Sequence, residues 1–271
     1  MLFQAQVSDH RWANAIETLE LADHRKHIDK DISRRRRAVL MTAEADRMAS
    51  EGAAPAAQDL AVSAAQDMPG FAPGVARAAN LLTKEGNTKK AASLIEKAWA
   101  AAPHPALAVA YRDIFSGETD KVRAKRMGAL VKTNPDHRES VILKAEEALH
   151  SGDGVTAWSA LSPLMQVGEP SARLCLLAAQ AEAMLKNPAD AAVWTECAAT
   201  APSEPDWADL DPEGDAFAYS DQDWRRLVFS YGESGELIHP RFESGAAKRA
   251  VIRGREEGKS VKEDSKLLHR Q

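Results

Sequence analysis

Two segments of the sequence decide the fold: "GAAPAAQDLAVSAAQDMP" (residues 52–69) and "GNTKKAASLIEKAWAAAP" (residues 86–103). Each begins with a glycine, carries small or aliphatic residues at matching offsets, and ends with a proline. The two glycines are 34 residues apart, and the two prolines are separated by the same interval. Similarity at a fixed interval indicates an internal structural repeat.

Each segment has the pattern of the second helix of a helical hairpin. In the second copy, a stripe with helical period is formed by Ala91, Leu94, Ile95, Ala98 and Trp99. Gly86 suits the left-handed end of a preceding helix over residues 75–86, and Pro103 prevents the second helix from continuing. The interval between the two copies is that of the tetratricopeptide hairpin, whose repeats stack into a superhelix.

Four less regular hairpins extend the repeat over residues 5–202. Upstream, a helix over residues 12–22 follows a turn in which His10 takes the glycine position, and the next helix has Ser33 as its candidate N-cap. Downstream, residues 117–135 are expected to pack Val122, Met127 and Leu130. We therefore predict an all-α fold, a right-handed α-solenoid of tetratricopeptide-like hairpins with a short irregular C-terminal appendage, because one hairpin cannot bury its apolar face alone.

The chain divides into three regions by composition. Residues 1–202 form the repeat domain, and residues 203–243 form an acidic, turn-rich appendage in which residues 224–235 make a short helix or a strand leading into a turn. Trp207 and Phe217 are expected to pack back on the last repeat helix. Residues 244–271 contain eight Lys and Arg against four Asp and Glu, with few large apolar side chains, and are predicted to be disordered.

Charge and hydropathy limit the partners of the chain. Its net charge of -5 and pI of about 5.9 argue against nucleic acid as the main partner. No run of about 18 apolar residues is present, and the first residues lack the pattern of a signal peptide, so we expect no membrane span and a soluble chain. Cys175 and Cys197 belong to no CxxC motif and are interpreted as core thiols in a reducing compartment.

No motif indicates catalysis. GxSxG, HExxH, GxxxxGK[ST] and GxGxxG are absent, so we predict a non-enzyme with no catalytic, cofactor-binding or metal site. His24 and His27 are interpreted as surface residues. The run Arg34–Arg37 is interpreted as a solvated helix start that pairs with neighbouring acids, because four consecutive helical residues point in all directions. Trp99, Trp158 and Trp194 are assigned to packing within second helices.

The order of five segments resembles the C-terminal half of the bacterial HemY-type tetratricopeptide proteins found in alphaproteobacteria, over about residues 8–207. These segments are "RRRAVLMTAEA", "ARAANLLTKEGNTKKAASLIEKAWAAAPHPALAVAY", "NPDHRES", "ARLCLLAAQAEA" and "VWTECAATAPSEPDW". The resemblance implies an inner-membrane protein with a helical hairpin in the bilayer and a soluble cytoplasmic repeat domain, which acts as a scaffold for enzymes or porphyrin intermediates in late haem biosynthesis. This chain lacks the membrane hairpin and the N-terminal half of the family, and no cysteine follows Trp207, where some relatives carry a zinc-ribbon-like end.

Two functions follow as hypotheses. The first is a scaffold that binds a partner protein or peptide, by resemblance a haem-biosynthesis enzyme, in the groove that first helices line. Its candidate groove residues are Asp46, Arg77, Asn80, Lys84 and Lys144. The alternative is a haem or porphyrin carrier with a histidine as axial ligand. His104 and His150 are at repeat ends, where exposure is expected, so the first hypothesis is favoured.

Overall fold

The computed structural model describes residues 1–115, 117–204, 219–239 and 242, and in this part of the chain all regular secondary structure is helical. The described residues form thirteen α-helices. Their bounds are α1 Leu2–Ser8, α2 Trp12–His24, α3 Lys30–Ser50, α4 Ala54–Asp67, α5 Ala72–Lys84, α6 Thr88–Ala101, α7 Pro105–Asp113, α8 Asp120–Thr133, α9 Arg138–His150, α10 Gly154–Met165, α11 Ala172–Met184, α12 Pro188–Thr200 and α13 Asp221–Ser234. The predicted all-α fold is confirmed.

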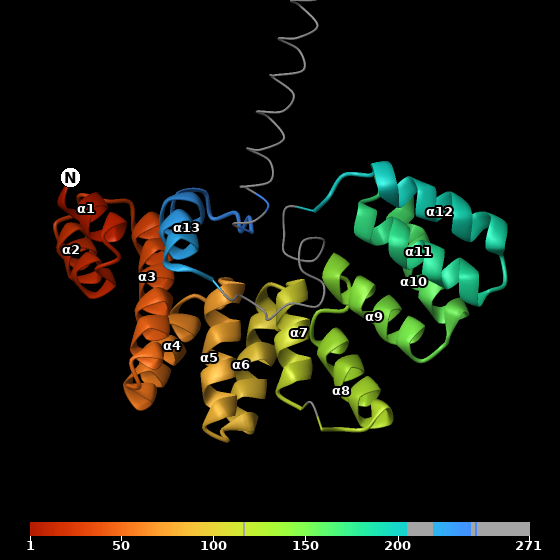
Figure 1. The fold of residues 1–271 in the computed structure, drawn as a ribbon, viewed down its shortest axis with the longest axis horizontal. Coiled ribbons are helices and arrows are strands. Elements are labelled where there is room, and N and C mark those ends of the chain that lie inside the picture. Colours follow the sequence, from red (N-terminus) through yellow and green to blue (C-terminus); the bar gives the residue numbers. More distant parts are fainter. Residues whose placement is uncertain (116, 205–218, 240–241, 243–271) are drawn as a thin grey trace, which may run out of the picture.

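The first twelve helices follow one another along an arc (Figure 1), and most successive pairs form antiparallel hairpins; α8 instead packs mainly on α9. Most of these helices pack mainly on their neighbours in the sequence, while α7 packs mainly on α5. The apolar core extends along the arc as three clusters. This arrangement is a helical-repeat solenoid, in which each hairpin is buried only by its neighbours.

The hairpin turns repeat a left-handed residue. Gly52 and Gly86 have φ angles of 87° and 78°, and Gly152 (79°) is followed one repeat interval later by Lys186 (61°). His10 has φ 56°, so it takes the glycine position in the first turn, as predicted. Lys186 occupies a conformation that is costly for a residue with a Cβ atom, which shows how firmly the packing of α11 and α12 fixes this turn.

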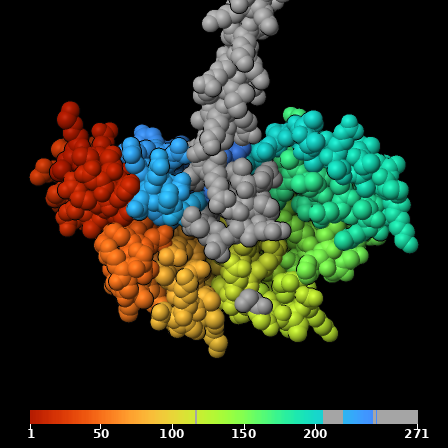
Figure 2. All heavy atoms as spheres, in the orientation of Figure 1, coloured from red at the N-terminus to blue at the C-terminus, as the bar shows by residue number. Residues whose placement is uncertain are grey.

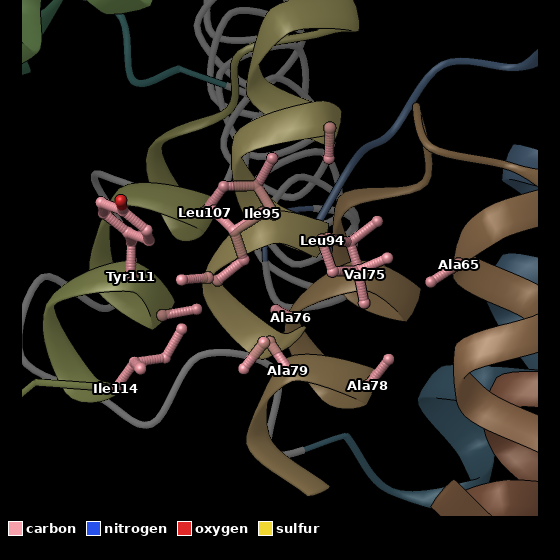
Figure 3. Packing of buried hydrophobic residues seen from close by; sticks show 14 of the residues in the cluster. Ala65, Val75, Ala76, Ala78, Ala79, Leu94, Ile95, Leu107, Tyr111 and Ile114 are labelled. Atoms are coloured by element: carbon pink, nitrogen blue, oxygen red, sulfur yellow. The ribbon is translucent and has the colours of Figure 1, made fainter. Parts of the chain in front are cut away.

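Small residues bring the helices close together. Ala78 and Ala79 on α5 are buried, and the predicted α6 stripe from Ala91 to Trp99 is buried with them. Figure 3 shows the labelled side chains of α4, α5, α6 and α7 directed into one common layer, with Ile95 and Leu107 among them. Close packing of this kind makes the middle of the arc rigid.

Two local predictions are wrong. The N-cap of α3 is Asp29, whose side chain accepts hydrogen bonds from the amides of Asp31 and Ile32, so the helix begins earlier and Ser33 is buried inside it. Val122 is 53% exposed, while Met127 and Leu130 are buried as expected. Val122 points outward because α8 turns only the face of Met127 and Leu130 toward the core.

The C-terminal appendage contains a helix that returns to the N-terminal end of the arc. Of the two alternatives for residues 224–235, the structure contains the helix, α13, which packs on α3 (Figure 1). A capping box between Ser220 and Asp223 starts it, and Gly235 ends it with φ 77°. Trp207, Phe217 and the tail after residue 243 lie outside the described residues, and the domain boundaries at 202 and 243 stay predictions.

Candidate functional site

First helices line the inner side of the arc, and two cavities open there. A cavity of about 560 Å³ lies between α7, α9 and α11, and a smaller one of about 110 Å³ lies between α5 and α7. The larger one is lined by Pro105, Val109, Arg112, Arg123, Glu146, Glu147, His150, Ala172, Arg173, Leu176, Leu177, Gln180 and Ser203. We call it the C-terminal groove. Its volume is in the range that binds ligands or a few side chains of a partner.

The C-terminal groove has an apolar floor. Val109 on α7 and Leu177 on α11 are partly buried, while Leu176 is 49% exposed. An exposed leucine inside a concavity can lose its contact with water only when something else covers it. The floor is therefore suited to an apolar side chain of a ligand.

An ion-pair network crosses the wall of this groove. Arg112 Nη2 lies 3.4 Å from Glu146 Oε2 and 3.2 Å from Glu147 Oε1, which joins α7 to α9. Arg173 of α11 donates to Glu139 Oε2 at 2.8 Å and to Glu146 Oε1 at 2.9 Å. Burial acts to lower the pKa of Arg173, but the Glu139 and Glu146 carboxylates outweigh it and raise the pKa, so this guanidinium stays charged.

The segment after α12 contributes Ser203 to the lining of the groove, and the next residue, Glu204, holds α11 in place. Glu204 is ion-paired with Arg138 and accepts a hydrogen bond from Ser171 Oγ at 2.6 Å, and Ser171 is the N-cap of α11. Burial acts to raise the pKa of Glu204, but the hydrogen bonds from Arg138 and Ser171 hold it below its ordinary value. Glu204 thus fixes the start of α11 against α9.

The two histidines have different positions. His150 is exposed at the rim of the C-terminal groove, 3.7 Å from Asp120, as expected. The expectation of exposure is wrong for His104, which is the N-cap of α7: its Nδ1 accepts from the Ala106 amide and its Nε2 is buried. Burial, with the charges of Arg173 and His239, lowers the pKa of His104 to about 3. Because a proline follows it, His104 has an extended backbone, with φ -141° and ψ 139°, and from this N-cap position its ring accepts from the first turn of α7.

In the N-terminal half of the inner side, α13 packs on α3, and Figure 2 shows the blue spheres of this segment beside the red N-terminal helices. Its buried stripe consists of Trp224, Leu227, Val228 and Tyr231. Trp224 Nε1 donates to Asp46 Oδ2 at 3.1 Å, and Asp46 is also ion-paired with Arg77. Burial raises the pKa of Asp46 in spite of Arg77.

The arginine run is a docking element for α13, which the sequence interpretation missed. Arg35 donates to the backbone oxygens of Gly232 (3.2 Å) and Glu233 (2.7 Å), and Arg36 pairs with the Glu233 carboxylate at 2.7 Å. A guanidinium at the last carbonyls of a helix satisfies groups that lack partners within the helix. Of the four arginines, only Arg34 and Arg37 are exposed. The prediction of a solvated helix start is therefore right for two of them. The i, i+3, i+4, i+7 stripe from Trp224 to Tyr231 was a signal that could have revealed this contact.

The predicted groove residues are divided between these regions. Asp46 and Arg77 pair beside α13, whereas Asn80 and Lys84 are exposed and line the smaller cavity together with Arg77. Lys144 is exposed on α9 and is not among the residues that line either cavity. Their role in binding stays a prediction.

Two kinds of feature are absent from the described ranges. Within residues 1–115, 117–204, 219–239 and 242, no three His, Cys, Asp or Glu side chains are grouped as a metal site. No helix among these residues is both long and apolar enough to cross a bilayer.

The chain resembles solved structures, although its sequence matches no known family. No family model matches the sequence, and no curated protein matches it. A solved tetratricopeptide repeat protein from Parabacteroides merdae ATCC 43184 is similar over 84% of this chain and 81% of its own, with 12% identity and a TM-score of 0.36.

Proposed function

We propose that the chain is a non-catalytic scaffold that binds an extended or helical segment of a partner protein in the C-terminal groove. The observation that carries this proposal is the exposed Leu176 on the floor of a 560 Å³ concavity whose wall holds charges of both signs. Helical grooves of this kind recognise apolar anchor residues flanked by polar ones.

The ion pairs in the wall of the C-terminal groove can open at low energetic cost. Arg112 and Glu146 are partly exposed, and such pairs contribute about 0–1 kcal/mol each. Opening one of them to engage a charge on the partner therefore costs little. The apolar floor supplies affinity, at about 25 cal/mol for each Å² removed from water, while the charges fix the register of the bound segment.

Partner identity is proposed from the sequence resemblance alone. The HemY-type segments make enzymes of late haem biosynthesis, at the inner membrane, the first partners to test. Binding of each purified enzyme to the full chain is measured by calorimetry, with Leu176→Asp as the groove variant.

The matched control is Val155→Asp, which places the same charge on an exposed valine of α10 that lines neither cavity. We expect at least tenfold weaker binding for Leu176→Asp, because covering the new carboxylate removes it from water without a partner. No change is expected for Val155→Asp, whose carboxylate stays hydrated. Equal affinity of the two variants would count against this groove.

A haem or porphyrin carrier is the second candidate, because His150 stands at the rim of the same apolar concavity. The His150 ring is exposed, whereas His104 has its Nδ1 engaged and its Nε2 buried. Titration with haem would give a saturable Soret shift that His150→Ala abolishes and His24→Ala preserves. A shift that persists in His150→Ala would exclude this residue as the ligand.

A further inference from the structure

The two cysteines lie side by side although they belong to different helices. Cys175 is on α11 and Cys197 is on α12, and their Sγ atoms are 2.8 Å apart with both thiols free. This distance is shorter than van der Waals contact of two sulfur atoms. A small shift of the side chains would bring them to the bond length of a disulfide, about 2.05 Å.

The two cysteines are placed where a bond between them would hold the two helices of the hairpin together. α11 and α12 are joined at one end by the turn around Lys186, and the cysteines face each other toward the opposite end. None of the residues of α12 is buried, because this last helix of the arc packs mainly on α11 and leaves its other side uncovered. A bond between the cysteines would close the open end of the terminal hairpin.

We propose that Cys175 and Cys197 are a thiol modification site, which a low-molecular-weight disulfide of the glutathione class oxidises to an intramolecular disulfide that joins α11 to α12. The inference is independent of the proposed function. The disulfide would be reversible, because low-molecular-weight thiols of the glutathione class reduce it again.

The order of the two steps follows from exposure. Cys175 is fully buried, and burial together with the Cys197 contact raises its pKa to about 12, so it stays protonated at neutral pH. Cys197 is partly exposed and attacks first: its thiolate displaces one thiolate from the small disulfide and forms a mixed disulfide.

The second step closes the bond. The Cys175 sulfur attacks the Cys197 sulfur and expels the second small thiolate, which takes up the proton that Cys175 gives up. Two protein thiols are thereby oxidised and one small disulfide is reduced to two thiols, so atoms and electrons balance. In the mixed disulfide, Cys197 has no thiol that could hydrogen-bond to Cys175. One of the causes that raise the pKa of Cys175 is therefore gone.

The bond affects the C-terminal groove because Leu176 directly follows Cys175 on α11. Oxidation restricts the opening of α12 away from α11. The disulfide would close a loop of residues 176–196. From the chain entropy that such a loop removes, we expect the population of the open hairpin to fall roughly tenfold to a hundredfold.

The test uses the full chain with glutathione disulfide, followed by acid quenching and intact mass measurement. We expect the wild type to lose the mass of two hydrogen atoms, to remain a monomer on a non-reducing gel, and to recover its mass with dithiothreitol. Cys175→Ala is expected to keep one glutathione on Cys197, and Cys197→Ala is expected to remain unmodified.

Hydrogen exchange of α12 amides provides the second readout, and we expect it to be at least tenfold slower in the oxidised protein. An unchanged mass, stable glutathione adducts on the wild type, or a disulfide-linked dimer would each overturn the modification site. Equal exchange of α12 in both redox states would overturn the locking of the hairpin.

Discussion

The two halves of the inner side of the arc are built from the same kind of hairpin but are used differently. In the N-terminal half, α13 covers α3 and buries Trp224, Leu227, Val228 and Tyr231. In the C-terminal half, the face of α7, α9 and α11 is an open cavity with Leu176 half-exposed on its floor. In the N-terminal half a helix of the same chain occupies the inner surface, whereas in the C-terminal half this surface is open to a partner.

The covered half shows what this surface recognises. α13 offers an apolar stripe, one indole N–H for a carboxylate, and near its C-terminus carbonyl oxygens for Arg35 and a carboxylate for Arg36. Each buried apolar side chain contributes about 1.5–3 kcal/mol. The open half has the counterparts of these elements, an apolar floor with carboxylates and guanidinium groups on its wall.

The largest effect is expected from Trp224→Ala. The side chain is 1% exposed, so its removal leaves a cavity and costs about 3–5 kcal/mol. We expect α1, α2 and α3 to lose protection in hydrogen exchange while α9 to α12 retain it. Gln222→Ala, at an exposed position of α13, is the control. Uniform loss of protection along the arc would show that the two halves do not unfold separately.

Acid is expected to weaken the C-terminal half first. The pKa of His104 is lowered from 6.5 to about 3, so between these values the unfolded chain binds a proton that the folded chain does not. The free energy of unfolding then falls as pH falls, by up to about 1.4 kcal/mol per pH unit. The raised pKa of Asp46 acts in the opposite direction, since its contribution is present at low pH and is lost as pH rises through the folded-state pKa.

His104→Asn tests this difference, because asparagine keeps an N-cap acceptor and does not titrate. Urea unfolding at pH 7 and pH 5 is expected to show a smaller pH dependence for this variant than for the wild type. Identical pH dependence of the two proteins would mean that another group controls acid stability.

Gly232→Ala is expected to loosen α13 by about 1–3 kcal/mol. A Cβ atom at this position would lie 2.6 Å from Arg36 Cγ, so either the arginine or the helix has to move. Gly128→Ala is the matched control in α8, where a Cβ atom has no neighbour within 4 Å. There we expect stabilisation of about 0.5–1 kcal/mol, because alanine favours helix over glycine. Thermal unfolding measures both, and equal signs would contradict the close approach of Arg36.

The smallest effect on stability is expected from Arg123→Ala in the wall of the C-terminal groove. Its ion pairs are 3.3 Å from Asp120 and 3.9 Å from Glu147, and Asp120 is highly exposed. Such pairs contribute less than about 1 kcal/mol, so urea unfolding should scarcely change. A larger loss would mean that the wall is part of the folding core and not an adaptable surface.

Local features of the site were within reach of the sequence, whereas its assembly was not. The helical stripe of α6, the left-handed positions of Gly52 and Gly86, and the turn at His10 follow from nearest neighbours in the chain. Asn80 and Lys84 are exposed on a first helix, and their role in binding stays a prediction. The low pKa of His104 could not be predicted, because burial in the folded chain and the charges of Arg173 and His239 from distant segments set it.

By itself, the sequence determined the repeating hairpin, because backbone propensity, glycine turns and apolar period act within a single repeat. Only the tertiary structure decided that α13 returns to α3, where Arg35 and Arg36 meet Gly232 and Glu233 from the far end of the chain. It likewise decided that Cys175 contacts Cys197 and that α7, α9 and α11 leave a cavity. The cysteine contact depends on how α11 and α12 pack within their hairpin. The cavity depends on how strongly the stacked hairpins curve, and this curvature is the sum of many small packing angles that no single segment encodes.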